Sequence, residues 1–300
     1  AAADPSRIAL VVGNDAYPGA PLANAVNDAK AMAGLLEKAG FGVDLLTNAD
    51  RASLADATKR LGAAARRDGT RFVFFYYAGH GAQLDWSNYL LPVDARVNDS
   101  ADLSAQCLDL GSVLAELSRT EGRTFVLVLD ACRDNPFGAA YRPPQRGLSP
   151  FDAPPGSLLA FSTAPGSVAA DASGPSGRNG LYTENLVREL SAPATKLEDA
   201  LKRVRLAVRI ASNGAQTPWE STSLESDVYL YPAATKMTEA ELEAEFEREL
   251  ATWNRIKAST RTEDWVAYLR AYPSGRFAEI AQSRLAYFAA RAADARASAC

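Results

Sequence analysis

Four apolar runs rich in β-branched and aromatic residues constrain the fold of this chain most strongly. Each run is apolar almost throughout, and together they cover residues 7–14, 71–78, 124–131 and 156–164. Continuous runs of this kind are typical of strands buried on both faces, as in a parallel sheet. Because helical patterns separate the runs, the sequence predicts the α/β class, with a mostly parallel central sheet flanked by helices.

The segments between the runs complete this expectation. We predict a helix that ends at Gly40 and a short strand over residues 42–47. Further helices are predicted over about 53–67 and 111–119, and two more within 181–212. Two stretches rich in Gly, Pro and polar residues, 133–156 and 171–180, are predicted to be exposed loops.

From Met237 onward the chain changes character, with many Ala, Glu and Arg residues at helical spacing. We therefore expect two parts, a main domain over 7–232 and a small helical appendage over 237–300, which we interpret as a helix pair. An apolar stripe runs along the appendage, made of Trp253, Ile256, Trp265, Tyr268 and Leu269. It either packs onto the main domain or itself, or binds a partner.

Composition excludes several classes of protein. The net charge is −4, which gives no general attraction to nucleic acid or anionic membranes, and no apolar run is long enough to span a bilayer. Three cysteines cannot form a disulfide framework, and with one histidine they make a poor zinc site. The alanine-rich start fits the remainder of an export signal, which would place the protein in the periplasm, and fits an engineered leader equally well; a cytoplasmic location stays open.

The single histidine and one cysteine occupy matching places at strand ends. His80 follows the strand that ends at Ala78, and Cys132 follows the strand that ends near Asp130. Parallel neighbouring strands would bring both to one edge of the sheet, where functional groups gather. Their separation of about 50 residues is that of the caspase His and Cys. Taken singly, each has a structural interpretation, a hydrogen-bonded histidine and a small buried thiol.

Such a pair can carry nucleophilic catalysis. The imidazole takes the proton of the thiol, and the resulting thiolate attacks the carbonyl carbon of a peptide bond. The imidazole then gives the proton to the leaving amine. Gly79 and Gly81 beside the histidine allow close backbone approach. The backbone N–H groups of Gly81 and Cys132 are candidate donors to an oxyanion. Cys107 and Cys300 lack such a setting and are interpreted as incidental.

Several motifs carry a resemblance to a known family. They occur in the family's order: "ALVVGNDAY", "NAVNDAKAMAGLLEKAGF", "FVFFYYAGHG", "NYLLPVDA" and "FVLVLDACRDNPF". Over roughly residues 7–232 the chain resembles the caspase-like cysteine peptidases (the caspase, metacaspase and paracaspase clan), in particular the bacterial orthocaspases and paracaspase-like proteins. The resemblance implies a caspase-hemoglobinase fold and a Cys–His dyad of Cys132 and His80.

Substrate preference follows from the charge beside the nucleophile. In metacaspases and paracaspases, acids at the positions that match Asp28 and Asp130 line the pocket for the residue before the scissile bond. Two confined carboxylates would reject an Asp side chain of the substrate and bind a guanidinium. We therefore predict cleavage after Arg, with Lys as the second preference. Alternatively, Asp28 is a helix N-terminal acid and Asp130 a strand-end acid held by a loop.

The chain also departs from family patterns. Metacaspases usually have "HSG" after the nucleophile, whereas this chain has "RDNPF", closer to paracaspases. Asp94, Asp99 and Asp102 are the candidate calcium ligands, but their spacing is shorter than in metacaspases, so we expect no required cofactor. Asp171 is the nearest counterpart of the third acid of the paracaspase pocket.

The loop after Cys132 suggests self-processing. It contains Arg133, Arg142 and Arg146, and Arg142 is followed by a proline, so Arg146 is the better site for self-cleavage.

The expected partners are protein or peptide substrates with exposed Arg or Lys, and we expect a monomer. A catalytically silent scaffold that recruits partners through the appendage is the alternative. A nucleotide-binding protein is disfavoured because "VVGNDAY" lacks the G-x-G-x-x-G phosphate cradle.

Overall fold

A twisted, mostly parallel sheet organises the main domain. The computed structural model describes residues 2–120, 122–132, 135–145, 147–164, 173–231 and 237–298, with the backbone alone at Cys132, Arg296 and Ser298. The sheet has the order β2-β1-β3-β6-β7-β8. Its strands are β1 (Arg7–Gly13), β2 (Gly42–Thr47), β3 (Phe72–Leu84), β6 (Thr124–Cys132), β7 (Ser157–Phe161) and β8 (Trp219–Thr222). All neighbours are parallel except β7 and β8, which confirms the predicted α/β class.

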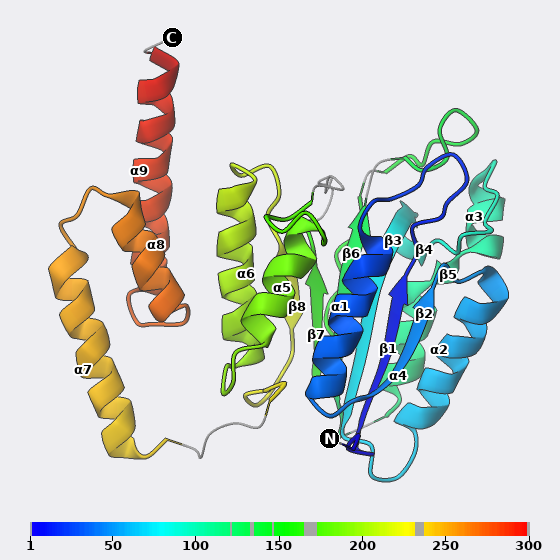
Figure 1. Cartoon of the computed structure of the whole chain (residues 1–300), viewed down its shortest axis with the longest axis horizontal. Helices are drawn as coiled ribbons and strands as arrows, with labels where there is room; N and C mark the ends of the chain where they lie inside the picture. Colours follow the sequence, from blue (N-terminus) through cyan, green and yellow to red (C-terminus); the bar gives the residue numbers. More distant parts are fainter. Residues whose placement is uncertain are drawn as a thin grey trace.

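Helices cover both faces of this sheet (Figure 1). On one face lie α1 (Ala25–Lys38), α5 (Leu181–Leu190) and α6 (Leu197–Ala211). On the other lie α2 (Arg51–Ala65) and α4 (Leu110–Ser118). Side chains of β3 alternate between the two layers, since Phe74 and Tyr76 pack with the first set and Phe75 and Tyr77 with the second. Burial on both faces explains why this strand is apolar throughout.

The third strand continues well beyond its predicted end at Ala78. Its last residues turn back as a hairpin with β4 (Ser87–Leu90), and β5 (Leu108–Asp109) adds to β4. A short helix, α3 (Ser100–Gln106), precedes β5. The sequence did not predict these elements, because they are short and their mixed polar composition has no clear period. The hairpin extends β3 past His80, so the histidine lies within a paired strand rather than after one.

The appendage contains three helices among the residues described, so the expected helix pair is wrong. They are α7 (Glu239–Ile256), α8 (Thr262–Ala271) and α9 (Ala278–Ser298). A capping box of Thr238 and Glu241 begins α7. The predicted apolar stripe does pack on itself, since Trp265, Tyr268 and Leu269 are buried and contact Trp253 and Ile256. None of the helices in the described ranges is both long and apolar enough to cross a bilayer.

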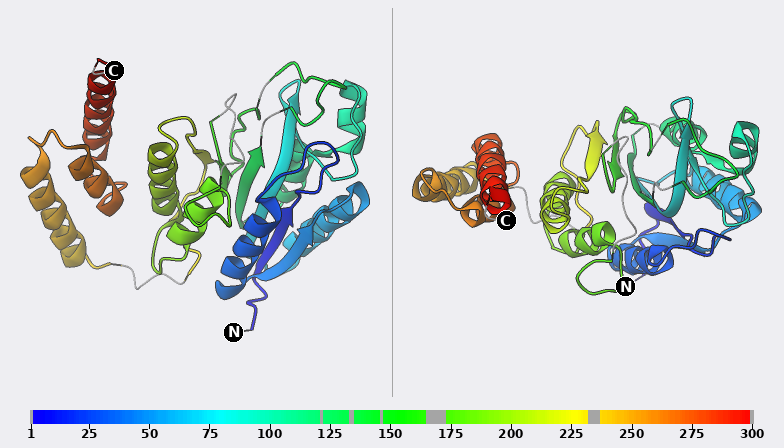
Figure 2. Two further views of the ribbon diagram at one scale, coloured as in Figure 1. Left: turned by 45° about the horizontal axis from the view of Figure 1, so that its top comes forward. Right: turned by 90° about the horizontal axis from the view of Figure 1, so that it is seen from above.

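The appendage lies beside α6, at the far side of the main domain from α2 (Figures 1 and 2). Leu206 of α6 belongs to the appendage's apolar cluster. Polar contacts cross the same boundary: Lys202 Nζ donates to Ser274 Oγ at 2.7 Å, and Arg203 Nε donates to the Arg270 carbonyl at 2.7 Å. The stripe therefore packs both onto itself and onto the main domain.

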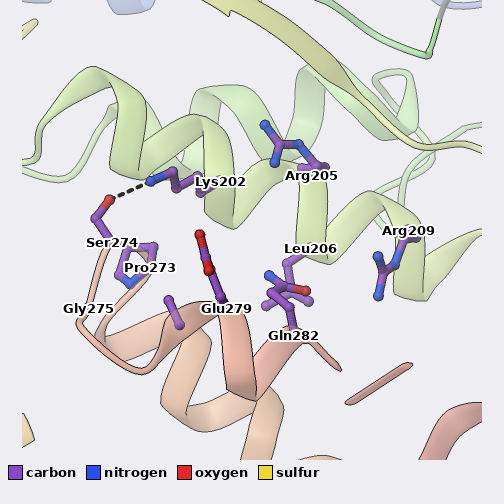
Figure 3. A pocket seen from close by; sticks show the side chains of 10 residues that line it. Lys202, Arg205, Leu206, Arg209, Pro273, Ser274, Gly275, Glu279 and Gln282 are labelled. Atoms are coloured by element: carbon purple, nitrogen blue, oxygen red, sulfur yellow. Dashed lines mark hydrogen bonds between the residues drawn. The ribbon is translucent and has the colours of Figure 1, made fainter. Parts of the chain in front are cut away.

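A cavity of about 430 Å³ lies at this boundary, between α6 and the turn that leads into α9 (Figure 3). Three cationic side chains of α6 line it, Lys202, Arg205 and Arg209, and Glu279 faces them from α9. Arg205 forms an ion pair with Glu220 of β8, and Lys202 donates a hydrogen bond to Ser274. Because residues of α6 and of the appendage line it, the cavity belongs to the interface between them.

Candidate active site

The two residues predicted to form a catalytic pair occupy adjacent positions of adjacent strands. His80 of β3 and Cys132 of β6 are direct Cα partners in the parallel ladder. Neighbouring strands are about 4.8 Å apart, which brings the two backbones within reach of a side-chain contact. Cys132 is the last residue of β6, so the pair lies at the carboxyl edge of the sheet. The side chain of Cys132 is outside the described part of the structure.

The imidazole of His80 is buried, with 4% of its surface exposed, and its orientation is set by the loop after β1. Its Nε2 lies 2.8 Å from the carbonyl oxygen of Ala20. Because a carbonyl oxygen can only accept, Nε2 carries the proton of the neutral ring, and Nδ1 is the basic nitrogen. The ring also packs against Tyr17, with centroids 4.5 Å apart. These contacts suit a histidine that exchanges one proton at one defined nitrogen.

Two buried tyrosines hold the backbone of the histidine. The hydroxyl of Tyr17 accepts from the His80 N–H at 3.1 Å, and the hydroxyl of Tyr77 donates to the His80 carbonyl at 2.7 Å. Burial raises the pKa of both phenols, so both stay protonated. At Gly79 an added Cβ would lie 2.6 Å from each hydroxyl oxygen, so only glycine leaves room for these two contacts.

The two predicted pocket acids also come together. Asp28 lies in the first turn of α1 and is buried, with 3% of its surface exposed, whereas Asp130 lies in β6 next to Ala131. Both carboxylates converge on Gly180 at the start of α5. A Cβ placed on Gly180 would lie 2.9 Å from Asp28 Oδ2 and 3.8 Å from Asp130 Oδ2. Residues distant in sequence thus form one acidic site on the face of the sheet covered by α1 and α5.

Hydrogen-bond donors from the start of α5 orient these acids. Asp28 Oδ1 accepts from the Gly180 N–H at 2.9 Å and from Asn179 Nδ2 at 2.8 Å. Asp130 Oδ2 accepts from Thr183 Oγ1 at 2.7 Å. These donors fix the orientation of both carboxylates, whose negative charge suits a site for a cationic group.

The remaining predicted residues have varied outcomes. Gly81 follows His80 in β3 and pairs with Leu90 of β4, so its part in an oxyanion site stays a prediction. Arg146 and Asp171 lie outside the described residues. The three candidate calcium ligands make hydrogen bonds: Asp94 accepts from the N–H of Arg51, Asp99 caps α3, and Asp102 accepts from Asn98 and Gln106. Within the part of the chain described, no three His, Cys, Asp or Glu side chains gather as a metal site.

Sequence reasoning missed the groups that hold the site in place. The carbonyl of Ala20 and the hydroxyl of Tyr17 orient His80, and Asn179, Gly180 and Thr183 contact the acids. A backbone carbonyl has no residue-type signal. The other four lie within the motifs "NDAY" and "NGLYT", but only the fold brings these motifs to the site.

A parallel sheet with a His–Cys pair at its carboxyl edge is the arrangement of a caspase-like cysteine peptidase, and the comparisons agree. A family model described as the caspase domain matches residues 6–229. A crystal structure of the Drosophila initiator caspase Dronc is similar in fold, with a TM-score of 0.52 and 16% identity, over 74% of this chain and 82% of that chain. No curated protein matches the chain. The chain belongs to the caspase-domain family, and as a cysteine peptidase its substrates are proteins or peptides.

Proposed function

We propose that this chain is an endopeptidase that cleaves after Arg, and then Lys, with Cys132 as nucleophile and His80 as general base and acid. The proposal is carried by one observation: strand β6 contributes a residue to the His80–Cys132 pair and another to the acidic site. Residue 132 of β6 lies in register with His80, and two residues earlier Asp130 shares an acidic site with Asp28. A basic side chain held by the acids would present the next peptide bond close to the nucleophile.

The proposed reaction uses each of these residues in turn. His80 Nδ1 takes the thiol proton, and the thiolate attacks the carbonyl carbon of the scissile bond. The N–H groups of Gly81 and Cys132 stabilise the oxyanion of the tetrahedral intermediate. His80 then protonates the leaving amine, and a thioester to Cys132 remains. Water, deprotonated by His80, attacks the thioester, and the thiol and the new carboxylate are released.

The acidic site provides the specificity of the proposed reaction. A guanidinium between Asp28 and Asp130 can donate to both carboxylates, and its planar group fits one of them with two parallel hydrogen bonds. Lysine would donate fewer hydrogen bonds from a single point charge, so we place it second. An aspartate in the same position would meet two negative charges and is excluded.

Hydrolysis of fluorogenic peptides tests this function. Peptides with Arg, Lys or Asp before the scissile bond are compared, with and without calcium, for the wild type and Cys132→Ala. We expect the order Arg, Lys, Asp in the wild type without calcium and no hydrolysis by Cys132→Ala. Activity that survives in Cys132→Ala would refute the nucleophile, and an inactive wild type under both conditions would favour a non-catalytic role.

Self-processing is a further part of the proposal. Arg142 is exposed and precedes Pro143, which disfavours cleavage after it, so Arg146 is the expected site. Mass spectrometry should find a break after Arg146 in the purified wild type and an intact chain in Cys132→Ala. The variant Arg146→Ala serves as the matched control, since its nucleophile is unchanged. The same break in wild type and Cys132→Ala would exclude self-cleavage as its cause.

A further inference from the structure

The start of α5 contacts both of the proposed pocket acids. Asn179 and Gly180 donate to one oxygen of Asp28, and Thr183 donates to one oxygen of Asp130. Three donors from five consecutive residues thus reach two carboxylates that belong to α1 and β6. One short segment therefore sets the orientation of both acids together.

The contact to Asp130 is part of a directed chain of hydrogen bonds. The hydroxyl oxygens of Tyr76 and Thr183 are 2.6 Å apart, and both side chains are fully buried. The Thr183 hydroxyl has one proton, which it donates to Asp130, so in its contact with Tyr76 it accepts and the phenol donates. The hydrogen bonds therefore run from Tyr76 to Thr183 and from Thr183 to Asp130, and Tyr76 occupies the acceptor side of the Thr183 hydroxyl.

Gly180 has a steric rather than a conformational role. It is the N-cap of α5, a position that usually favours Ser, Thr, Asn or Asp. Its φ of −62° and ψ of 151° are open to any residue, so the backbone does not require glycine. An added Cβ, however, would lie between the two acids, 2.9 Å from Asp28 Oδ2 and 3.8 Å from Asp130 Oδ2. Glycine leaves this space open.

We propose that residues 179–183 determine which basic side chain the acidic site accepts. This inference rests on the proposed function of Asp28 and Asp130. Gly180 leaves the width that a planar guanidinium needs, and Thr183, which accepts from Tyr76, orients the Asp130 carboxylate toward it. A methyl group at position 180 narrows the site, and it excludes the wide guanidinium of Arg more strongly than the compact ammonium of Lys.

The test compares Gly180→Ala with the wild type on matched Arg and Lys peptides. Its backbone angles suit alanine, but the added Cβ lies 2.9 Å from the buried Asp28 carboxylate, so we expect this variant to fold with a modestly lowered Tm. We expect kcat/KM for Arg to fall by at least tenfold, mainly through KM, and the preference for Arg over Lys to be lost. The rate at which iodoacetamide alkylates Cys132 should stay within twofold, since this small neutral reagent does not use the acidic site.

Gly34→Ala is the matched control. Gly34 lies inside α1, and an added Cβ there meets nothing within 4 Å, so its Arg-to-Lys ratio should equal that of the wild type. Thr183→Val removes the hydroxyl at similar volume and should raise KM for Arg, whereas Thr183→Ser should restore it. If Thr183→Val does not fold, Gly180→Ala still decides the inference.

The outcomes separate this inference from the proposed function. A wild type that prefers Arg, with the same preference in Gly180→Ala, would overturn the role of residues 179–183 and leave the function intact. A fall in cleavage accompanied by an equal fall in Cys132 alkylation would also overturn it, because the catalytic pair would then be disturbed. A wild type inactive on both peptides would remove the proposed function and this inference together.

Discussion

The proposed catalytic pair and the acidic site share one strand, β6, but are held in opposite ways. The Nε2 of His80 contacts a neutral acceptor, the carbonyl of Ala20, whereas Asp28 and Asp130 receive N–H and O–H donors from the start of α5. The difference matches what each site needs. A general base must gain and lose a proton, so its partner fixes a tautomer without adding charge, whereas a site for a cation needs carboxylates that stay ionised.

The largest expected effect follows from removal of the imidazole. His80→Ala should lower kcat about 10²- to 10⁴-fold or more, the usual contribution of general acid–base catalysis, with little change in KM for an Arg peptide. Steady-state kinetics with the Arg peptide measure both constants. A comparable rise in KM would show that the histidine and the acidic site are not separate in function.

The reverse pattern is expected at the acids. Asp130→Asn should lower kcat/KM for Arg about 30- to 3,000-fold, since an unpaired buried charge costs about 2–5 kcal/mol. The loss should lie mainly in KM, and alkylation of the Cys132 thiol should continue. Asp28→Asn should act in the same direction. An unchanged Arg preference in both variants would exclude these acids as the specificity site while leaving the catalytic pair in place.

A smaller effect is expected where the tyrosines hold the histidine. Gly79→Ala places a Cβ 2.6 Å from the hydroxyls of Tyr17 and Tyr77, and overpacking of this kind costs about 1–3 kcal/mol. We expect a lower Tm and a lower kcat, measured by thermal unfolding and kinetics. Gly34→Ala should instead stabilise α1 by about 0.5–1 kcal/mol. A Gly79→Ala variant as stable and active as the wild type would contradict the assigned role of the two phenols.

The smallest effect concerns the other described cysteine. Burial raises the pKa of the Cys107 thiol to about 12, so little of it is thiolate at neutral pH. At pH 8, iodoacetamide should modify Cys132 well before Cys107, as peptide mapping would show, and Cys107 should become reactive only as the pH approaches its pKa. Cys107→Ser should retain full activity. Equal labelling of both thiols at pH 8 would mean that Cys132 is not activated by its surroundings.

The sequence predicts the parts of this molecule that follow from period and burial. The apolar runs identify the parallel sheet, and strand ends bring His80 and residue 132 to one edge. The pairing of Asp28 with Asp130 came from the family resemblance, since no local pattern links α1 to β6. The contacts of Ala20, Tyr17 and Thr183 could not be predicted, because they depend on how loops and helices meet after folding. The hairpin after His80 was missed because short polar segments show little period. The third helix of the appendage was missed because the break between α7 and α8, residues 257–261, contains neither Gly nor Pro.

Covalent capture by a substrate-like probe tests the central claim most directly. A peptide acyloxymethyl ketone with Arg before the reactive group, and the same peptide with Asp instead, are each incubated with the full chain, and the adduct is located by mass spectrometry. The account predicts rapid formation of one thioether at Cys132 with the Arg probe, much slower reaction with the Asp probe, and slow reaction of the Arg probe with Asp130→Asn. An adduct on another residue, or equal rates for the two probes, would contradict it.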